Sequence, residues 1–341
     1  MGALARYSRG HPHDRHARGV SVLRRWRSAG ERIPAGGAVF YLGLVALKLI
    51  AFFLALFPRP VFLGLGRGLG FILRKAGMRR AVAQENIARA FPALPAAEVE
   101  SFLNKSYGEL GTLFLEMLRS FYKFDRFIER YSDVENAHHL EAALAQGKGV
   151  FVMTAHLGNW EVLTGVGPTL MGTPVTMVTK QLKPRWFHRC VEVTRSLIGI
   201  KMACEPKTMQ GILRALKKKE IVGFVMDQFT GAPVGARVPF FGVPVGSHTA
   251  LATLAMRTGA PVVPAIAVRK PDGRYLIRFD APLATIDKGD QEQSVLANTA
   301  AYVARTEEWI KEFPPQWMWI HRRWKGDLSP LPQGAIGEML K

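Results

Sequence analysis

The longest apolar stretch of the chain covers residues 38–57, where Lys48 is the one charged residue. About twenty apolar residues suffice to cross the hydrocarbon core of a bilayer. The stretch is too long and lies too far inside the chain for a signal peptide. A buried core helix is the alternative for a stretch of this length. We expect a membrane-anchoring helix here.

The next segment, residues 61–80, mixes apolar residues and glycines with arginine and lysine. This composition predicts an amphipathic segment that lies on the membrane surface. Basic residues flank the apolar stretch on both sides, so the positive-inside rule gives no orientation. An anchor that lies in the membrane without crossing it is consistent with both basic flanks.

The remainder of the chain has the pattern of an α/β protein. Residues 81–122 carry apolar positions at three- and four-residue spacing, which predicts helices. Short apolar segments then alternate with amphipathic helices, and this predicts an α/β sandwich with a mixed, largely parallel sheet. The predicted strands are residues 149–156, 174–180, 221–228, 261–270 and, as an edge strand, 274–283.

These patterns divide the chain into four segments. We expect a basic, disordered tail at residues 1–36, an anchor with an interfacial segment at 37–80, a catalytic domain at 81–330 and a short tail at 331–341.

Charge and cysteine content narrow the partners and the compartment. The formal net charge is +19, from 46 Lys and Arg against 27 Asp and Glu, which indicates an anionic partner such as nucleic acid, anionic lipid or an acidic carrier protein. No helix-turn-helix, zinc-finger or aromatic RNA-binding signature supports nucleic acid. Cys190 and Cys204 have neither disulfide-framework nor metal-site spacing, so a reducing compartment is the simple interpretation.

The segment TAHLGNWE, residues 154–161, carries the candidate chemistry. A predicted strand delivers His156 into a turn at its carboxyl end, where reactive groups of open α/β sheets lie. Asn159 suits the N-cap of the following helix. If Glu161 lies in the first turn of that helix, it can accept a hydrogen bond from one imidazole nitrogen. The other nitrogen can then take a proton from a hydroxyl. A structural His–Glu pair at the start of a helix is the alternative.

The string HLGNWE fits the His-x4-Asp/Glu signature of the glycerolipid acyltransferase superfamily. With residues 225–228, 238–269 and 311–325 and the apolar stretch, the chain resembles the lipid A biosynthesis (late) acyltransferases from about residue 38 onward. The chain differs from the best-known branch in two places. Phe229 stands where that branch often has aspartate, and HLGNWE is the form common to the broader family. Members of the broader family also acylate other glycolipids, such as phosphatidylinositol mannosides.

The resemblance implies O-acyl transfer from an acyl-acyl-carrier-protein, or acyl-CoA, to a glycolipid hydroxyl, in the best-known branch that of a lipid A precursor. His156 and Glu161 are then the catalytic pair, and no metal or redox cofactor is expected. The bacterial inner membrane is the expected place, with the catalytic domain on the cytoplasmic face. The alternatives are acylation of a phosphatidylinositol-mannoside-type lipid and a non-catalytic lipid-binding protein of the same fold.

Several polar residues are candidates for substrate contacts, and Asn159 is counted with them. Asp227 and Gln228 end a predicted strand, where they bind an acceptor hydroxyl, fix a basic side chain or form a turn. Arg195 offers a fixed fork of donors for an oxyanion or phosphate, unless it is a surface helix arginine. Arg237 is a candidate for a phosphate contact.

Further clusters have two interpretations each. Phe240 and Phe241 line an acyl tunnel or pack in an ordinary core. The run Lys217–Lys219 is a solvated helix face or a docking site for an acidic carrier or anionic headgroups. The tryptophans and basic residues of 317–325 suit the bilayer interface or a buried aromatic belt.

Overall fold

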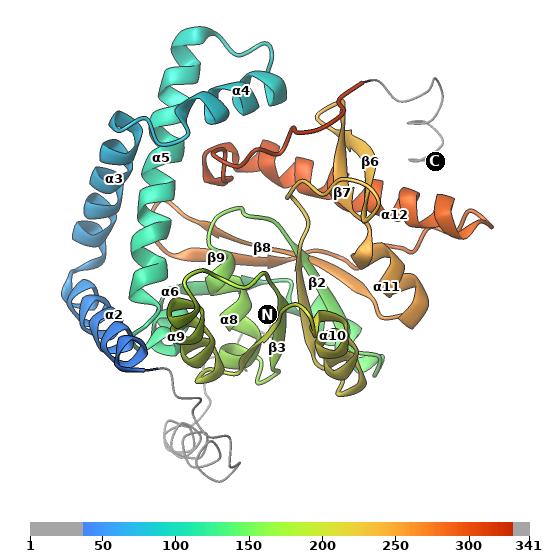
Figure 1. Cartoon of the computed structure of the whole chain (residues 1–341), viewed down its shortest axis with the longest axis horizontal. Helices are drawn as coiled ribbons and strands as arrows, with labels where there is room; N and C mark the ends of the chain where they lie inside the picture. The colour runs from blue at the N-terminus through green and yellow to red at the C-terminus, as the bar shows by residue number, and fades with distance from the viewer. Residues whose placement is uncertain (1–36, 330–341) are drawn as a thin grey trace.

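A seven-stranded sheet organises the protein in the computed structural model, which describes residues 37–329 (Figure 1). The strand order is β1-β9-β8-β2-β5-β3-β4, and neighbouring strands are parallel except β8 and β9. The predicted mixed, largely parallel sheet is confirmed. The strands are β1 (Ser132–Glu135), β2 (Val150–Thr154), β3 (Val175–Val178), β4 (Ile200–Ala203), β5 (Ile221–Val225), β8 (Val262–Arg269) and β9 (Tyr275–Phe279).

The edges of the sheet differ from the prediction. The strand expected at the edge, β9, lies between β8 and β1, because β1 pairs with it in parallel. The true edges are β1 and β4, which are four residues long and only partly buried, so neither has a clear apolar pattern. A separate antiparallel hairpin of β6 (Gly235–Phe240) and β7 (Val243–His248) was also not predicted.

Helices cover both faces of the sheet. Alternate residues of β2 point to opposite faces, so that Phe151 and Met153 join one core and Val150 and Val152 the other. The first core includes residues of α4, α5, α10, α11 and α12, and the second includes residues of α6, α7 and α8. Their bounds are α4 (Arg80–Ala90), α5 (Ala96–Arg119), α6 (Phe124–Tyr131), α7 (Ala137–Ala145), α8 (Trp160–Leu170), α10 (Thr208–Lys217), α11 (Ala250–Thr258) and α12 (Gln291–Glu312).

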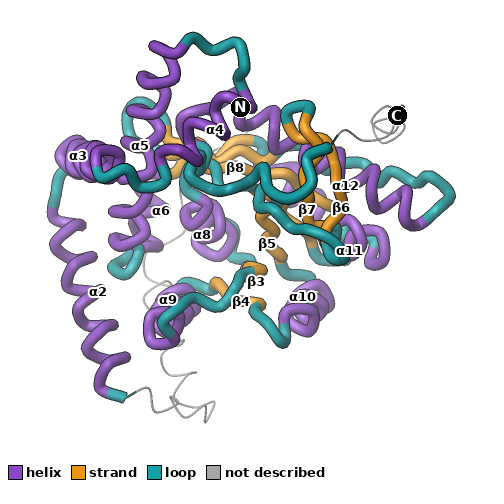
Figure 2. Tube along the Cα trace, turned by 45° about the horizontal axis from the view of Figure 1, so that its top comes forward, coloured by secondary structure: helices purple, strands orange, loops and turns teal. Residues whose placement is uncertain are grey.

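Two N-terminal helices lie along one outer edge of the molecule (Figures 1 and 2). The helix α2 (Ala38–Leu56) is long and apolar enough to cross a membrane. It packs on α9 (Arg185–Ser196) and on the end of α5, and α3 (Arg59–Lys75) packs along α5. The tails predicted at 1–36 and 331–341 lie outside the described residues.

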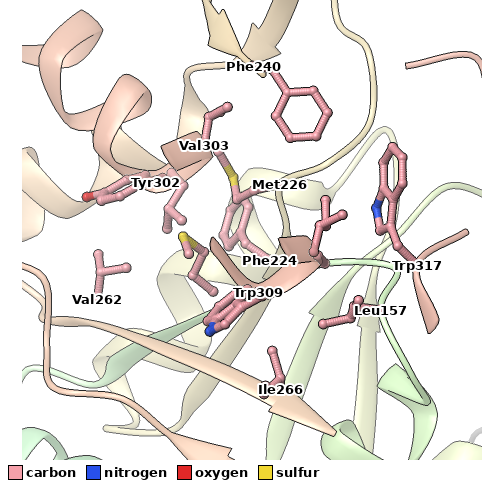
Figure 3. Packing of buried hydrophobic residues seen from close by; sticks show 14 of the residues in the cluster. Leu157, Phe224, Met226, Phe240, Val262, Ile266, Tyr302, Val303, Trp309 and Trp317 are labelled. Carbon is pink, nitrogen blue, oxygen red and sulfur yellow. The ribbon is translucent and has the colours of Figure 1, made fainter. Parts of the chain in front are cut away.

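The tryptophans of 317–325 form a buried aromatic cluster rather than a belt at the bilayer. Trp317, Trp319 and Trp324 are each less than a tenth exposed. The Phe240 ring lies 5.0 Å from the Trp324 ring and 5.8 Å from the Trp317 ring, and Figure 3 shows Phe240 among core side chains. For these residues the core-packing interpretation is therefore correct.

Candidate active site

The turn after β2 is held by close backbone contacts. Gly158 has φ +60°, and a Cβ atom there would lie 2.0 Å from the Ala267 carbonyl oxygen, so only glycine fits. The Gly158 N–H donates to the Gln316 carbonyl at 2.9 Å. The Asn159 side chain accepts from the Glu161 and Val162 N–H groups at 3.1 Å each, which confirms the predicted N-cap of α8.

His156 is bound by a buried aspartate at the end of β5. The His156 Nδ1 atom lies 2.8 Å from Asp227 Oδ1, and the His156 backbone N–H donates to Asp227 Oδ2 at 2.8 Å. The Trp317 indole N–H donates to the same Oδ2 at 2.7 Å. Of the alternatives for Asp227, the structure shows the one in which it fixes a basic side chain.

The electrostatics of Asp227 decide which imidazole nitrogen carries the proton. Burial by itself raises the pKa of Asp227, but the His156 ring, together with hydrogen bonds from His156 and Trp317, lowers this pKa to about 2. An ionised carboxylate only accepts hydrogen bonds, so Nδ1 of His156 carries a hydrogen toward it. In the neutral ring, Nε2 then carries the lone pair that a general base needs, and this lone pair accepts from the Gln228 amide N–H.

The Nε2 atom of His156 lies beside Gln228, and His156 is also one of the residues that line a small recess. The Gln228 amide nitrogen lies 3.3 Å from Nε2. The recess is bounded by one side of α5 and by the 3-10 turn η1 (Pro314–Gln316) with the two residues after it. Its lining residues are Ser106, Glu109, Leu110, Leu113, His156, Gly158, Pro315, Gln316, Trp317 and Met318.

Glu161 does not make the predicted contact with His156. Both oxygens of its carboxylate accept from Arg195, with the Nε–Oε2 distance at 3.1 Å and a second, shorter bond from Nη2 to Oε1. The physical reason is that Glu161 sits in the first turn of α8, opposite the last turn of α9, while Asp227 already occupies Nδ1. The predicted hydrogen bond of the dyad is therefore wrong. Arg195 is likewise engaged in this ion pair.

The other predicted residues lie in structural contacts. Arg237 pairs with Asp327 at 2.9 Å and donates to Ser329. The backbone N–H of Phe241 donates to Glu307 Oε2 at 2.7 Å. The lysine run 217–219 is exposed and lies just before the amino end of β5, whereas His156 follows the carboxyl end of the neighbouring strand β2. For the lysines, a solvated face is the simpler interpretation.

A buried charged network, which was not predicted from the sequence, lies behind the active-site turn. Glu116 of α5 is 2% exposed, and its Oε2 accepts from Asn159 at 3.0 Å and from Arg269 at 2.6 Å. Its Oε1 accepts from Arg59 at 2.7 Å, and the Tyr275 hydroxyl donates to Oε2. Burial raises the pKa of Glu116, but Arg269 and Arg59 lower it overall. These residues are 43 to 159 positions apart from Glu116, so no local motif marks them.

Arg323 holds a second set of contacts near the site. This fully buried side chain donates to the carbonyls of Gln228 at 3.1 Å and Gly246 at 2.7 Å, and to the Ser247 hydroxyl at 2.5 Å. Burial lowers the pKa of Arg323 to about 10. Arg323 therefore fixes the segment that follows Asp227 against the β6–β7 hairpin.

Comparison with known proteins identifies the family of the chain. The sequence profile of the bacterial lipid A biosynthesis acyltransferases matches residues 32–326. The chain belongs to this acyltransferase family. Its family relationship confirms the resemblance on which the sequence analysis drew.

Individual relatives of this acyltransferase are distant but match over most of their length. The lipid A biosynthesis lauroyltransferase of Escherichia coli K12 is 28% identical over 81% of this chain and 89% of its own. The lipid A biosynthesis palmitoleoyltransferase of the same organism is 29% identical over 79% of this chain and 86% of its own length. The phosphatidylinositol mannoside acyltransferase of Mycolicibacterium smegmatis is 26% identical over 90% of this chain and 98% of its own length.

Proposed function

We propose that this acyltransferase moves a fatty acyl group from a carrier thioester to a hydroxyl of a glycolipid, with His156 as general base and Asp227 as the group that orients it. The observation that carries the proposal is the 2.8 Å contact between His156 Nδ1 and the buried Asp227, which leaves Nε2 as the basic nitrogen of a residue that lines the recess. Asp227 thus takes the role that the sequence analysis assigned to Glu161.

The reaction needs no nucleophile from the enzyme. Nε2 of His156 removes the proton from the acceptor hydroxyl as its oxygen attacks the thioester carbonyl carbon. The tetrahedral intermediate collapses with cleavage of the carbon–sulfur bond, and the thiolate takes the proton from the imidazolium. The carboxylate of Asp227 stabilises that imidazolium, as the aspartate of a serine-protease triad does.

Gln228 and the Glu161–Arg195 pair have supporting roles in this proposal. The Gln228 amide lies 3.3 Å from Nε2, so it can hold the acceptor oxygen beside the base. Arg195 and Glu161 are each mostly buried and neutralise one another. Their bidentate pairing fixes the last turn of α9 to the first turn of α8, which follows the His156 turn directly.

The donor, acceptor and location are proposed from the family. Acyl-acyl-carrier-protein is the proposed donor, with acyl-CoA as the alternative, and a lipid A precursor is the proposed acceptor. Relatives named for lipid A and for phosphatidylinositol mannoside both match, so a mannoside-type lipid is the second candidate acceptor. The proposed location is the cytoplasmic leaflet of the inner membrane, supported by the apolar helix α2.

A substrate-resolved assay tests the proposal. The purified full-length protein is incubated with acyl-acyl-carrier-protein or acyl-CoA and with either acceptor, and products are identified by mass spectrometry. We expect the His156→Ala variant to lose acyl transfer while it still binds lipid. His138→Ala, at an exposed histidine of α7, is the matched control and keeps full activity. Full activity of His156→Ala contradicts the mechanism, and lipid binding without product from the wild type favours a non-catalytic lipid carrier.

A further inference from the structure

The exposed apolar surface of the protein is concentrated at its N-terminal edge. Fourteen of the eighteen exposed large hydrophobic side chains in the described part of the chain lie between Val39 and Ile72, on α2, on α3 and at the junction between them. Both helices form the outer edge of the molecule in two views (Figures 1 and 2). A contiguous patch of this kind marks a surface that meets a partner or a membrane.

Both ends of α2 contact the same folded body. Near its start, the carbonyl of Phe40 accepts from the buried Cys190 thiol of α9 at 3.8 Å. Near its end, the Phe52 ring packs at 5.4 Å from the Tyr122 ring, just after α5. A 19-residue helix is about 28 Å long, close to the thickness of a bilayer core. A crossing α2 therefore requires the same body to lie on both sides of the membrane.

The neighbour of α2 makes crossing unfavourable as well. The helix α9 carries Arg185, Arg189, Glu192 and Arg195 and is packed against the first half of α2. If α2 crossed the bilayer, α9 would enter the hydrocarbon with it. A charged side chain at the centre of a membrane costs about 2.5–3.5 kcal/mol even on the lower scale, and the Arg189–Glu192 and Arg195–Glu161 pairs lower this cost but leave Arg185 with it. This energy opposes a crossing orientation.

The charge of the surface fits anionic headgroups. Residues 37–82 contain seven Lys and Arg and no Asp or Glu. Lys48, Arg67 and Lys75 are exposed on the two helices. Lys48 lies in the middle of α2, where a crossing helix would place it near the bilayer centre. At the lipid–water interface the same side chain extends into the headgroups at little cost.

We propose that α2 and α3 form a monotopic docking surface, here called the α2–α3 surface and made of the exposed residues from Val39 to Ile72. In this arrangement α2 lies along the interface of an anionic leaflet and does not cross it. This inference rests on the proposed function in one respect: the enzyme has to reach a lipid acceptor that lies in a membrane.

The α2–α3 surface also brings the leaflet close to the active site. Gly66 and Gly70 of α3 pack against Gly111 of α5 so closely that a Cβ atom on Gly70 would lie 2.0 Å from a carbonyl oxygen of α5. The same α5 lines the recess beside His156 through Leu110 and its neighbours. Helix axes in contact are typically 8–10 Å apart. The recess is therefore separated from the docked leaflet by the two packed helices α3 and α5.

A labelling experiment in native membranes tests the orientation of α2. The full-length chain carries Cys190→Ala and Cys204→Ser, and one cysteine is introduced at a time, as Val39→Cys or Phe57→Cys at the exposed ends of α2. A membrane-impermeant maleimide is added to spheroplasts and to inverted inner-membrane vesicles. We expect both positions to react from the same side. Reaction of the two positions from opposite sides overturns the proposal.

A vesicle-binding experiment tests the α3 half of the surface. Leu65→Glu and Ile72→Glu place a charge on the exposed stripe of α3, and Leu213→Glu places one on exposed α10 as the matched control. With phosphatidylglycerol-containing vesicles we expect at least tenfold weaker binding for the α3 variants and unchanged binding for the control. Equal binding by all three overturns the proposal.

Activity on detergent-dispersed substrate keeps this inference separate from the proposed function. The α3 variants are expected to retain turnover in detergent, since neither residue lines the recess. Loss of vesicle binding with retained turnover supports the docking surface. If the wild type shows no turnover, the proposed function is contradicted, but the labelling and vesicle-binding results can still be interpreted.

Discussion

Replacement of Asp227 by asparagine decides which carboxylate supports His156. The Asp227→Asn amide is close in shape to the carboxylate, so the Trp317 N–H can still donate to its oxygen. The amide nitrogen, however, donates toward His156 Nδ1 and favours the tautomer with the hydrogen on Nε2. That tautomer lacks the lone pair needed to accept the proton of the acceptor hydroxyl.

The size of the effect follows from the structure. The pKa of Asp227 is about 2 in place of the ordinary 3.8, and each unit corresponds to about 1.4 kcal/mol. That shift describes the ground state; loss of a correctly positioned general base costs at least about 10²-fold in kcat, the lower end of what general-base catalysis contributes. The wrong tautomer adds to it, and the corresponding change in a serine-protease triad lowers kcat about 10⁴-fold. We expect a decrease between these limits.

The assay compares Asp227→Asn with Glu161→Gln under single-turnover conditions with an acyl thioester donor. Asp227→Asn is expected to lower the rate of the chemical step. Glu161→Gln breaks the ion pair with Arg195 and is expected to act less on that step, because Glu161 does not contact the imidazole. If Glu161→Gln abolishes turnover while Asp227→Asn retains more than half of it, the assignment of Asp227 is refuted.

Asp227 also links stability to pH. Because its pKa in the folded protein lies below the ordinary value, its contribution to stability is present above about pH 4 and is lost as pH falls toward 2. Asp227→Asn should remove about 2 kcal/mol of this acid dependence. Chemical denaturation measured from pH 5 to pH 2 checks the sign, and an unchanged slope contradicts the ionised, buried carboxylate.

Three further substitutions test the contacts around the site. Trp317→Phe removes the indole donor to Asp227, and we expect about 1–3 kcal/mol lower stability and at least tenfold lower kcat, measured by denaturation and by turnover. Gly158→Ala forces a Cβ into a backbone carbonyl of β8 and should abolish activity, with the melting temperature of the purified variant as the folding check. Arg323→Lys loses the fork of donors, and its free energy of unfolding should fall by about 2–4 kcal/mol. Arg322→Lys, at an exposed position, is the control, and its free energy of unfolding should be within about 0.5 kcal/mol of the wild-type value.

Elements with strong local patterns could be predicted from the amino-acid sequence alone. The apolar strands that became β2, β5 and β8 are buried along almost their whole length, so nearly every residue contributes to the signal. The N-cap at Asn159 could be predicted because a cap involves only the few residues that follow it in the chain. The position of His156 followed for the same reason, since a strand end and its turn are adjacent in the chain.

The groups that meet across the sheet could not be predicted in this way, because their contacts depend on how the strands and helices pack. Glu161 is five residues from His156, yet Asp227, 71 residues away, binds the imidazole because β2 and β5 are paired in parallel and end side by side. Glu116 likewise reaches Asn159 only through the packing of α5. Such contacts depend on strand order and helix packing, which arise from the burial of apolar faces throughout the domain and leave no fixed spacing in the sequence.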